Sequence, residues 1–392
     1  MQLVFPEIDE AECLRTLQDI VRIKSYSQTQ GEIDVTNHVA AVMKTMGIDG
    51  GVYPFDDGAR QNAIGRWKGS GGGKTLLFNG HMDTNPVGEG WTVDPWGGIV
   101  KDDDCIYGIG VSNMKSGCAA YLCAVQTLLK AGWKLKGDVI LTFVVGELQG
   151  GPGTVAAIEQ GHCDADYFVN CEPSDVRAIT MHAESEIFEI ALTGVTRHMS
   201  KREEATDVIL AASDLVPRLT KLTFPNAPSP VHASINRCHV GVIRAGLGKE
   251  MAEWRPPQSP IRRHQGAARI APGQTGADVR TALTAASHGM PSFEVSRESR
   301  IVRSLNASYE AVRGVPQPTG AIKPICFYGS DAGHLYRKLG MEGIVCGPGG
   351  KFNTMPDERV ELKDYYDCIR IFVRLIVDIC GVGEVPDDQR RR

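Results

Sequence analysis

The chain has 392 residues, of which 42% are hydrophobic and 23% are charged, a composition typical of a globular protein with a substantial core. At about 150 residues per domain, this length predicts two or three domains. The formal net charge of −5 excludes the strongly basic surface of a nucleic-acid-binding protein. No apolar run reaches the roughly 18 residues of a membrane helix.

The N-terminal segment has neither the basic start nor the apolar core of a secretion signal. The eleven cysteines are scattered and form no Cys-x-x-Cys pair, as in a protein that keeps its thiols reduced. We therefore expect a cytoplasmic protein without disulfides, with neither nucleic acid nor membrane among its partners.

The first part of the chain alternates between helical and strand-like patterns. Helical spacing of apolar residues occurs over 11–22, 31–46 and 115–131. Short apolar runs typical of buried strands occupy 75–78, 139–145 and 166–169. Continuous apolar strands between helices indicate a sheet covered on both faces, which is the α/β class.

From residue 184 the pattern changes. Residues 187–192 alternate as a half-exposed strand does, 205–222 has helical spacing, and 249–268, with several prolines and arginines, predicts an irregular segment. Strand patterns return at 325–328 and 343–346, before a helical pattern over 362–379. The chain thus predicts a larger α/β domain in two parts, 1–183 and 298–392, with a small α+β domain, 184–297, inserted between them.

Polar clusters follow four of the predicted strands, at the edge where ligands collect in open α/β sheets, and the fourth of them is the loop 347–358 after the strand at 343–346. His81 and Asp83 follow the first, Glu147 the second and Glu172 the third. A histidine binds a metal best when its other ring nitrogen donates to a carboxylate, and Asp83 lies on the same side of an extended chain as His81. The alternative is a loop histidine beside a capping aspartate.

Three further places in the sequence have a chemical or a structural interpretation. A carboxylate such as Glu147 at a dry strand end tends to have a raised pKa, which suits a general base. Asn113 stands where a helix begins and is also a good N-cap residue. Segment 69–75 resembles a phosphate loop, but a strand follows it instead of a helix, so we interpret it as a hairpin turn without nucleotide binding.

The order and spacing of five such segments, from Gly80-His81-Met82-Asp83-Thr84 to Pro356-Asp357-Glu358, resemble the co-catalytic metallopeptidase family of clan MH. That family includes acetylornithine deacetylase, succinyl-diaminopimelate desuccinylase, aminoacylase and the glutamate carboxypeptidases. The resemblance covers nearly the whole chain. It implies a zinc-exopeptidase-like catalytic domain, an inserted ferredoxin-like lid domain that usually dimerises, and the hydrolysis of C–N bonds.

By this resemblance, His81 and Glu172 are ligands of the first metal, Asp83 orients His81, and Glu147 is the general base that takes a proton from a metal-activated water. His198, in the lid, matches a histidine that steadies the oxyanion in a neighbouring active site.

The resemblance also implies two substrate-binding residues in the lid. Arg280 matches an arginine that binds the substrate carboxylate. Arg269 stands where the family has an asparagine, and it could hold the same group.

The chain departs from the family at three metal-ligand positions. The bridging aspartate is Asn113, the second-metal glutamate is Leu148, and the closing histidine is Thr354. Two dications without bridging carboxylates repel strongly. We therefore expect one labile divalent metal, Mn²⁺ or Zn²⁺, held by His81, Asn113 and Glu172. Asp331 and His334, in segment 329–334, are spare groups that could add a metal ligand, but we interpret this segment as a substrate-loop turn.

Three functions stay open. The leading hypothesis is a hydrolase of a C–N bond, ordinarily an amide, in a small carboxylate-bearing molecule, working as a homodimer or larger homo-oligomer through the lid. A narrower hypothesis is the deamination of an aromatic amine at a single metal, such as 5-nitroanthranilate to 5-nitrosalicylate, as in a single-metal relative, 5-nitroanthranilic acid aminohydrolase. The third is a metal-free, non-catalytic binding protein of the same fold.

Overall fold

The computed structural model describes residues 2–193, 195, 197–246, 261–270, 290–386 and 389–391. The chain separates into two compact units. Unit 1 comprises Met1–Met181, Phe293–Ile325 and Ser330–Arg392. Unit 2 comprises His182–Ser292 and Cys326–Gly329.

Unit 1 is built on a mixed sheet that has eight strands in the described residues. They are β2 (Asp49–Phe55), β3 (Arg60–Trp67), β4 (Leu76–His81), β8 (Val139–Val144), β9 (Tyr167–Asn170), β10 (Ala178–Ile179), β16 (Thr319–Gly320) and β17 (Glu342–Val345). Their order is β16-β10-β17-β9-β4-β8-β3-β2. The central strands β17, β9, β4 and β8 run parallel, so their carboxyl ends meet at one edge. Beyond them, β3 pairs antiparallel with β8, and β2 with β3.

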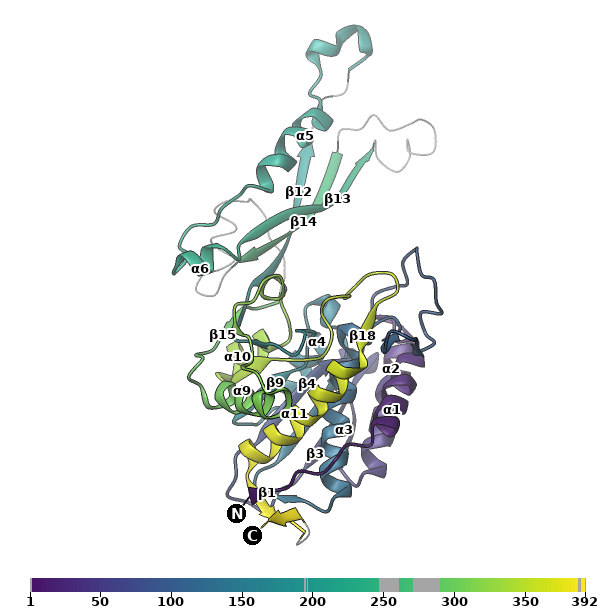
Figure 1. The fold of residues 1–392 in the computed structure, drawn as a ribbon. Coiled ribbons are helices and arrows are strands. Elements are labelled where there is room, and N and C mark those ends of the chain that lie inside the picture. Colours follow the sequence, from purple (N-terminus) through teal and green to yellow (C-terminus); the bar gives the residue numbers. More distant parts are fainter. Residues whose placement is uncertain are drawn as a thin grey trace. The chain divides into compact units, whose positions relative to one another are not determined.

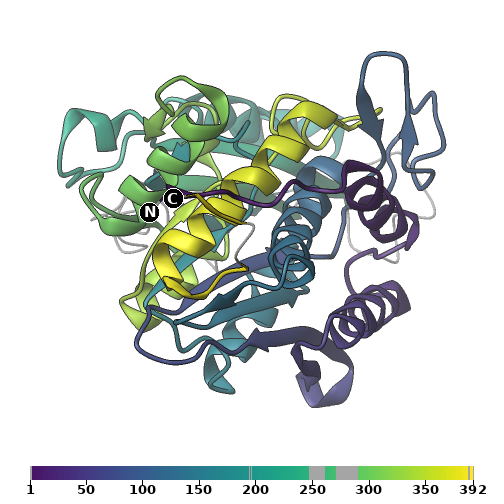
Figure 2. The ribbon, with the colours of Figure 1, turned by 60° about the horizontal axis from the view of Figure 1, so that its bottom comes forward.

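Helices cover both faces of this sheet, as Figures 1 and 2 show. They are α1 (Glu10–Arg22), α2 (Gln30–Thr45), α3 (Ser116–Lys130), α4 (Pro152–Glu159), α9 (Arg300–Arg313), α10 (Ala332–Leu339) and α11 (Leu362–Cys380). On β4, a side chain at Gly80 would meet Cys118 of α3, whereas its neighbour Asn79 donates to Thr154 of α4. Because successive strand residues face opposite ways, α3 and α4 lie on opposite faces. Every residue of β4 and β8 is buried between them, as expected for a doubly covered sheet.

Among the described residues, three small sheets complete unit 1. They are β5 (Ile99–Val100), β6 (Cys105–Tyr107) and β18 (Arg359–Glu361) in one sheet, β7 (Lys134–Leu135) with β19 (Val382–Glu384), and β1 (Gln2–Leu3) with β20 (Arg390–Arg391). A further pair, β11 (Met181–His182) with β15 (Phe293–Glu294), lies where the chain passes between the units. All eleven cysteines are free and buried.

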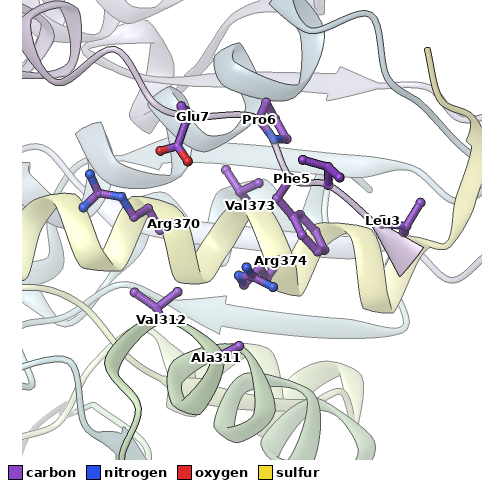
Figure 3. Close-up of a pocket in the computed structure, with 10 residues that line it drawn as sticks. Leu3, Phe5, Pro6, Glu7, Ala311, Val312, Arg370, Val373 and Arg374 are labelled. Atoms are coloured by element: carbon purple, nitrogen blue, oxygen red, sulfur yellow. The ribbon is translucent and has the colours of Figure 1, made fainter. Parts of the chain in front are cut away.

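The N-terminal segment runs along α11, and Figure 3 shows Phe5 beside Arg374 of that helix. The Arg374 guanidinium lies 4.3 Å from the centre of the Phe5 ring. A hollow of about 390 Å³ lies between this segment, α9 and α11. None of the predicted site residues lines this hollow.

The described part of unit 2 has an antiparallel three-stranded sheet in the order β12-β14-β13. Its strands are β12 (Glu184–Thr193), β13 (Arg237–Gly246) and β14 (Ile261–Ile270), and its helices are α5 (Val208–Leu219) and α6 (Pro230–Ala233). Leu219, Phe224 and Cys238 form a small core that joins α5 to the sheet.

The predicted helices of unit 1 are confirmed to within about one residue, but three local predictions are wrong. The segment 249–268 was predicted to be irregular, but residues 261–268 belong to β14, which pairs with β12 on one side and β13 on the other. Backbone pairing thus outweighs the irregular sequence pattern there. Residues 249–260 lie outside the described residues. Residues 325–327 form a short 3₁₀ turn, and burial of Ile325 and Cys326 accounts for the apolar run. Segment 69–75 is not a hairpin turn, because β8 lies between the strands that it connects, β3 and β4.

Candidate active site

His81, the last residue of β4, faces three oxygen-bearing side chains at the carboxyl edge of the sheet. Its Nε2 lies 3.1 Å from Oδ1 of Asn113, 3.6 Å from Oε1 of Glu172 and 4.0 Å from Oε2 of Glu147. Glu147 begins a 3₁₀ turn (Glu147–Gln149) just after β8, and Glu172 follows β9. Parallel strands that end together thus bring residues from distant parts of the sequence to one place.

One donor atom from each of His81, Glu147 and Glu172 lies within 4.8 Å of the others, and His81 and Glu172 are buried. We call these three residues the donor group. Imidazole nitrogen and carboxylate oxygen are the ligands that Zn²⁺ and Mn²⁺ accept, and the Asn113 amide oxygen can add a neutral ligand. The residues present therefore fit a divalent metal ion.

Electrostatics in the donor group also favour a cation. Burial, followed by repulsion from Glu172, raises the pKa of Glu147 well above its ordinary range. Burial raises the pKa of Glu172 to about 7, although His81 opposes the shift and the Asp331 carboxylate adds to it. A bound dication would relieve both effects, because it neutralises the carboxylates without a proton.

Asp83 holds the His81 ring in place. The ring Nδ1 lies 2.9 Å from the Asp83 carbonyl oxygen and 3.3 Å from its carboxylate Oδ1. The carboxylate also accepts hydrogen bonds from the Ser27 hydroxyl and from the backbone N–H of Gly146. Burial alone would raise the pKa of Asp83, but the hydrogen bond and charge of His81, followed by the Ser27 and Gly146 donors, outweigh burial and hold it at about 2. Asp83 is therefore ionised and fixes the ring so that Nε2 points at the donor group.

A buried ion pair supports the turn that carries Glu147. The Arg60 guanidinium donates to both carboxylate oxygens of Glu32, at 2.9 and 2.6 Å, and to the side-chain oxygen of Gln149 at 3.2 Å. The Arg60 guanidinium also packs against Gly146, the residue before Glu147: a Cβ atom at Gly146 would lie 2.6 Å from its terminal nitrogen. This support could not be predicted from the sequence, because no local pattern distinguishes Arg60 or Glu32 from other charged residues.

Glu358 holds the turn that carries Asn113. Its Oε1 accepts hydrogen bonds from the backbone N–H groups of Ser112 at 2.7 Å and Asn113 at 2.9 Å. Next to this turn, the buried Lys115 ammonium donates to the carbonyl oxygens of Ile20 and Ile23, at the end of α1. The sequence placed Glu358 in a motif, but not in this role.

The other positions singled out by sequence do not belong to the donor group among the described residues. Leu148 is half-buried, and Thr354 is exposed and donates its hydroxyl hydrogen bond to Asn353. Asp331 is buried at the start of α10, and His334 Nε2 lies 2.9 Å from the Gly150 carbonyl oxygen.

Three predicted site residues belong to unit 2. His198 is exposed, precedes a 3₁₀ turn (Met199–Glu204) and bonds through its ring to Ser200. Arg269 lies in β14, where its backbone is opposite Ser185 and Arg237. Arg280 lies outside the described residues. The roles of all three stay predictions.

No helix in the described ranges combines the length and the apolar character needed to cross a membrane.

Comparison with known proteins identifies relatives along nearly the whole chain. Succinyl-diaminopimelate desuccinylase of Cereibacter sphaeroides is 25% identical over 92% of this chain and 97% of its own length. Succinyl-diaminopimelate desuccinylase 2 of Ruegeria is 29% identical, but that match spans 50% of this chain and 51% of the relative. Among solved structures, an M20 family metallo-carboxypeptidase of Sulfolobus solfataricus superposes with a TM-score of 0.77 at 16% identity, covering 93% of this chain and 98% of that one.

The structural likeness confirms the predicted α/β fold with small inserted sheets. Residues 77–378 match the model of peptidase family M20/M25/M40. That range includes the donor group, Asp83 and Asn113. The chain therefore belongs to the M20/M25/M40 peptidase family and is a metal-dependent hydrolase acting on C–N bonds.

Proposed function

We propose that this enzyme hydrolyses an amide C–N bond in a small, carboxylate-bearing molecule, with one divalent metal, Mn²⁺ or Zn²⁺, per chain. The observation that carries the proposal is the donor group itself. His81, Glu147 and Glu172 each offer a donor atom within 4.8 Å of the others, at the edge where parallel strands end.

In this proposal, His81, Glu172 and the amide oxygen of Asn113 hold the metal. When bound, the metal supplies Lewis acidity toward a water molecule and the substrate carbonyl. Glu147 takes a proton from the attacking water and returns a proton to the leaving nitrogen. Burial, which raises the pKa of Glu147, brings its basicity nearer to the working pH. Asp83 acts as a positioning residue through His81.

Three side chains argue for one metal ion per site and against two. Asn113 is neutral, Leu148 has no donor atom and Thr354 offers only a hydroxyl. Two dications a few ångströms apart need bridging negative charge, which these residues do not supply. Glu172 is the only carboxylate among the three proposed ligands. A site with so little negative charge binds its metal weakly, so we propose that the metal ion exchanges readily.

The substrate class follows from the relatives and from the lid predictions. The names desuccinylase and carboxypeptidase support an amide substrate with a carboxylate. We propose that Arg280 and Arg269 bind that carboxylate, and that His198 steadies the oxyanion in a neighbouring subunit of a homodimer or larger homo-oligomer. Nothing in the described ranges favours an aromatic amine such as 5-nitroanthranilate over an amide.

The test combines metal counting with turnover. The full chain is loaded with Mn²⁺ or Zn²⁺, desalted and analysed for metal, and then assayed on N-succinyl and N-acetyl amino acids. We expect at most one metal per chain, and hydrolysis that a chelator abolishes and added metal restores. Two tightly held metals would contradict the single site. Absence of hydrolysis in the metal-loaded enzyme with every acylated amino acid would contradict the amide proposal.

A further inference from the structure

A second hollow, of about 150 Å³, adjoins the donor group in unit 1. Asn113 connects the two, because it lines this hollow while its Oδ1 lies 3.1 Å from Nε2 of His81. Thr354 also lines it. The hollow therefore lies where two of the three departures from the family's ligand pattern meet, and we call it the Asn113 pocket.

The walls of the Asn113 pocket are largely apolar. They include Pro86, Trp91, Ile109, Met355 and Pro356. Met355 is 45% exposed, and Trp91 is half-buried. Exposed apolar side chains gathered around a hollow next to a reaction centre indicate a binding surface, because a ligand that covers them removes apolar area from water.

The pocket offers little to a charged ligand. No lysine, arginine or histidine is among the described residues that line it. Its one acidic residue, Glu358, is buried, and its Oε1 already accepts hydrogen bonds from Ser112 and Asn113. The other polar lining groups, on Asn85, Asn113 and Thr354, are neutral. An anion would find no partner there, and a cation would find only an occupied carboxylate.

We infer that the Asn113 pocket binds an uncharged, apolar group of the substrate, no larger than about one six-membered ring, on the Asn113 side of the scissile bond. The size follows from the volume, since a cavity of about 150 Å³ accommodates one benzene ring. This inference rests on the proposed function, because it takes the donor group as the place of the scissile bond. The carboxylate of the substrate would lie elsewhere.

Binding of small neutral amides tests the pocket without turnover. Benzamide and acetamide are titrated into the metal-loaded full chain and followed by ligand-observed NMR. We expect benzamide to bind with millimolar affinity and acetamide at least tenfold more weakly. Trp91→Ala removes one wall and should weaken benzamide binding about tenfold. Val100→Ala is the matched control, because Val100 is an apolar residue of β5 that is 38% exposed and does not line the pocket.

A filling variant gives an independent readout. Gly88 lines the pocket, and a side chain there would meet no atom within 4 Å of its Cβ, so Gly88→Leu should fold and should abolish benzamide binding. In hydrolysis, the ratio of kcat/KM for N-benzoyl over N-acetyl amino acids should fall about tenfold in Trp91→Ala.

Equal benzamide affinity in the wild type and Trp91→Ala, or acetamide bound as tightly as benzamide, would overturn the inference. Benzamide binding that Trp91→Ala weakens, in an enzyme that hydrolyses no amide, would support the pocket and contradict the proposed function instead.

Discussion

The carboxylate of Asp83 accepts a hydrogen bond of 2.9 Å from the backbone N–H of Gly146. This bond ties the loop after β4, which follows His81, to the loop after β8, which carries Glu147. The same carboxylate is 3.3 Å from Nδ1 of His81, so one buried charge positions both a proposed metal ligand and the proposed base.

Replacing Asp83 should therefore weaken metal binding without removing a ligand. In Asp83→Asn, the amide keeps the shape but loses the charge that orients and polarises His81, and we expect metal affinity to fall about 10–100-fold. Competition with a fluorescent chelator measures the affinity. Asp49→Asn, at a largely exposed aspartate, is the control and should leave it unchanged. Unaltered affinity in Asp83→Asn would refute the positioning role.

Glu147→Gln should separate binding from chemistry. The amide has nearly the same volume but cannot take a proton, and loss of a general base costs about 10²–10⁴-fold in rate. We expect kcat to fall in that range while an unreacted substrate analogue still binds, as calorimetry would measure. A variant with wild-type kcat would exclude Glu147 as the base.

Asn113→Asp adds a negative charge next to the donor group, and it should act in opposite directions on the metal-bound and metal-free forms of the protein. With metal, we expect about tenfold tighter binding, because affinity for divalent cations rises with ligand charge. Without metal, a further carboxylate beside Glu172 should lower the Tm through like-charge repulsion. Metal titration and thermal melts in a chelator check both. We still expect one ion, since Leu148 supplies no donor; binding of two would contradict the single-metal proposal.

Stability of the metal-free protein should depend on pH through Glu358. Burial raises the pKa of this carboxyl from its ordinary value near 4.5 to about 7, although hydrogen bonds from Asn113 and Ser112 oppose the shift. A pKa raised by folding means that the folded chain holds the proton more tightly. The resulting stabilisation is complete below pH 4.5 and is lost as the pH rises through 7, a change of about 3 kcal/mol.

Glu358→Gln tests this dependence, because the amide oxygen can still accept from the backbone and does not titrate. Urea unfolding in a chelator, at pH 4.5 and at pH 8, gives the free energy of unfolding for both proteins. The wild type should lose about 3 kcal/mol more than the variant over that interval. Parallel pH profiles would show that Glu358 does not titrate with folding.

The buried Arg60–Glu32 ion pair should contribute far more to the stability of the fold than an ion pair on the surface. Glu32→Gln leaves the buried guanidinium without its counter-charge, and breaking such a pair costs about 3–5 kcal/mol. In the matched control Asp19→Asn, whose partner Arg22 is about half exposed, the change should stay below about 1 kcal/mol. Because Arg60 also bonds Gln149, kcat should fall in the folded fraction of Glu32→Gln. Equal losses of stability in the two variants would contradict this view.

The features that depend on local sequence pattern and on position at a strand end were predicted correctly from the sequence. The apolar run 139–145 matches β8. His81, Glu147 and Glu172 could be grouped because each lies at the carboxyl end of a parallel strand. Strand β14 escaped prediction, since its stability comes from pairing with two distant strands. So did the hydrogen bond from Ser27 to Asp83, which joins residues 56 apart in the chain. Supporting contacts of this kind depend on the folded arrangement and leave no periodic trace in the sequence.

The complete burial of the eleven cysteines makes the native protein suitable for thiol-specific labelling as it stands. Reagents that attack surface thiols need an exposed thiolate, and no native cysteine provides one. A cysteine introduced at Leu210, 63% exposed in unit 2, and another at Val315, 52% exposed in unit 1, would each be the preferred site of modification. A donor and an acceptor dye at these two positions would report the separation of the units in solution, with and without substrate, in an otherwise unaltered enzyme.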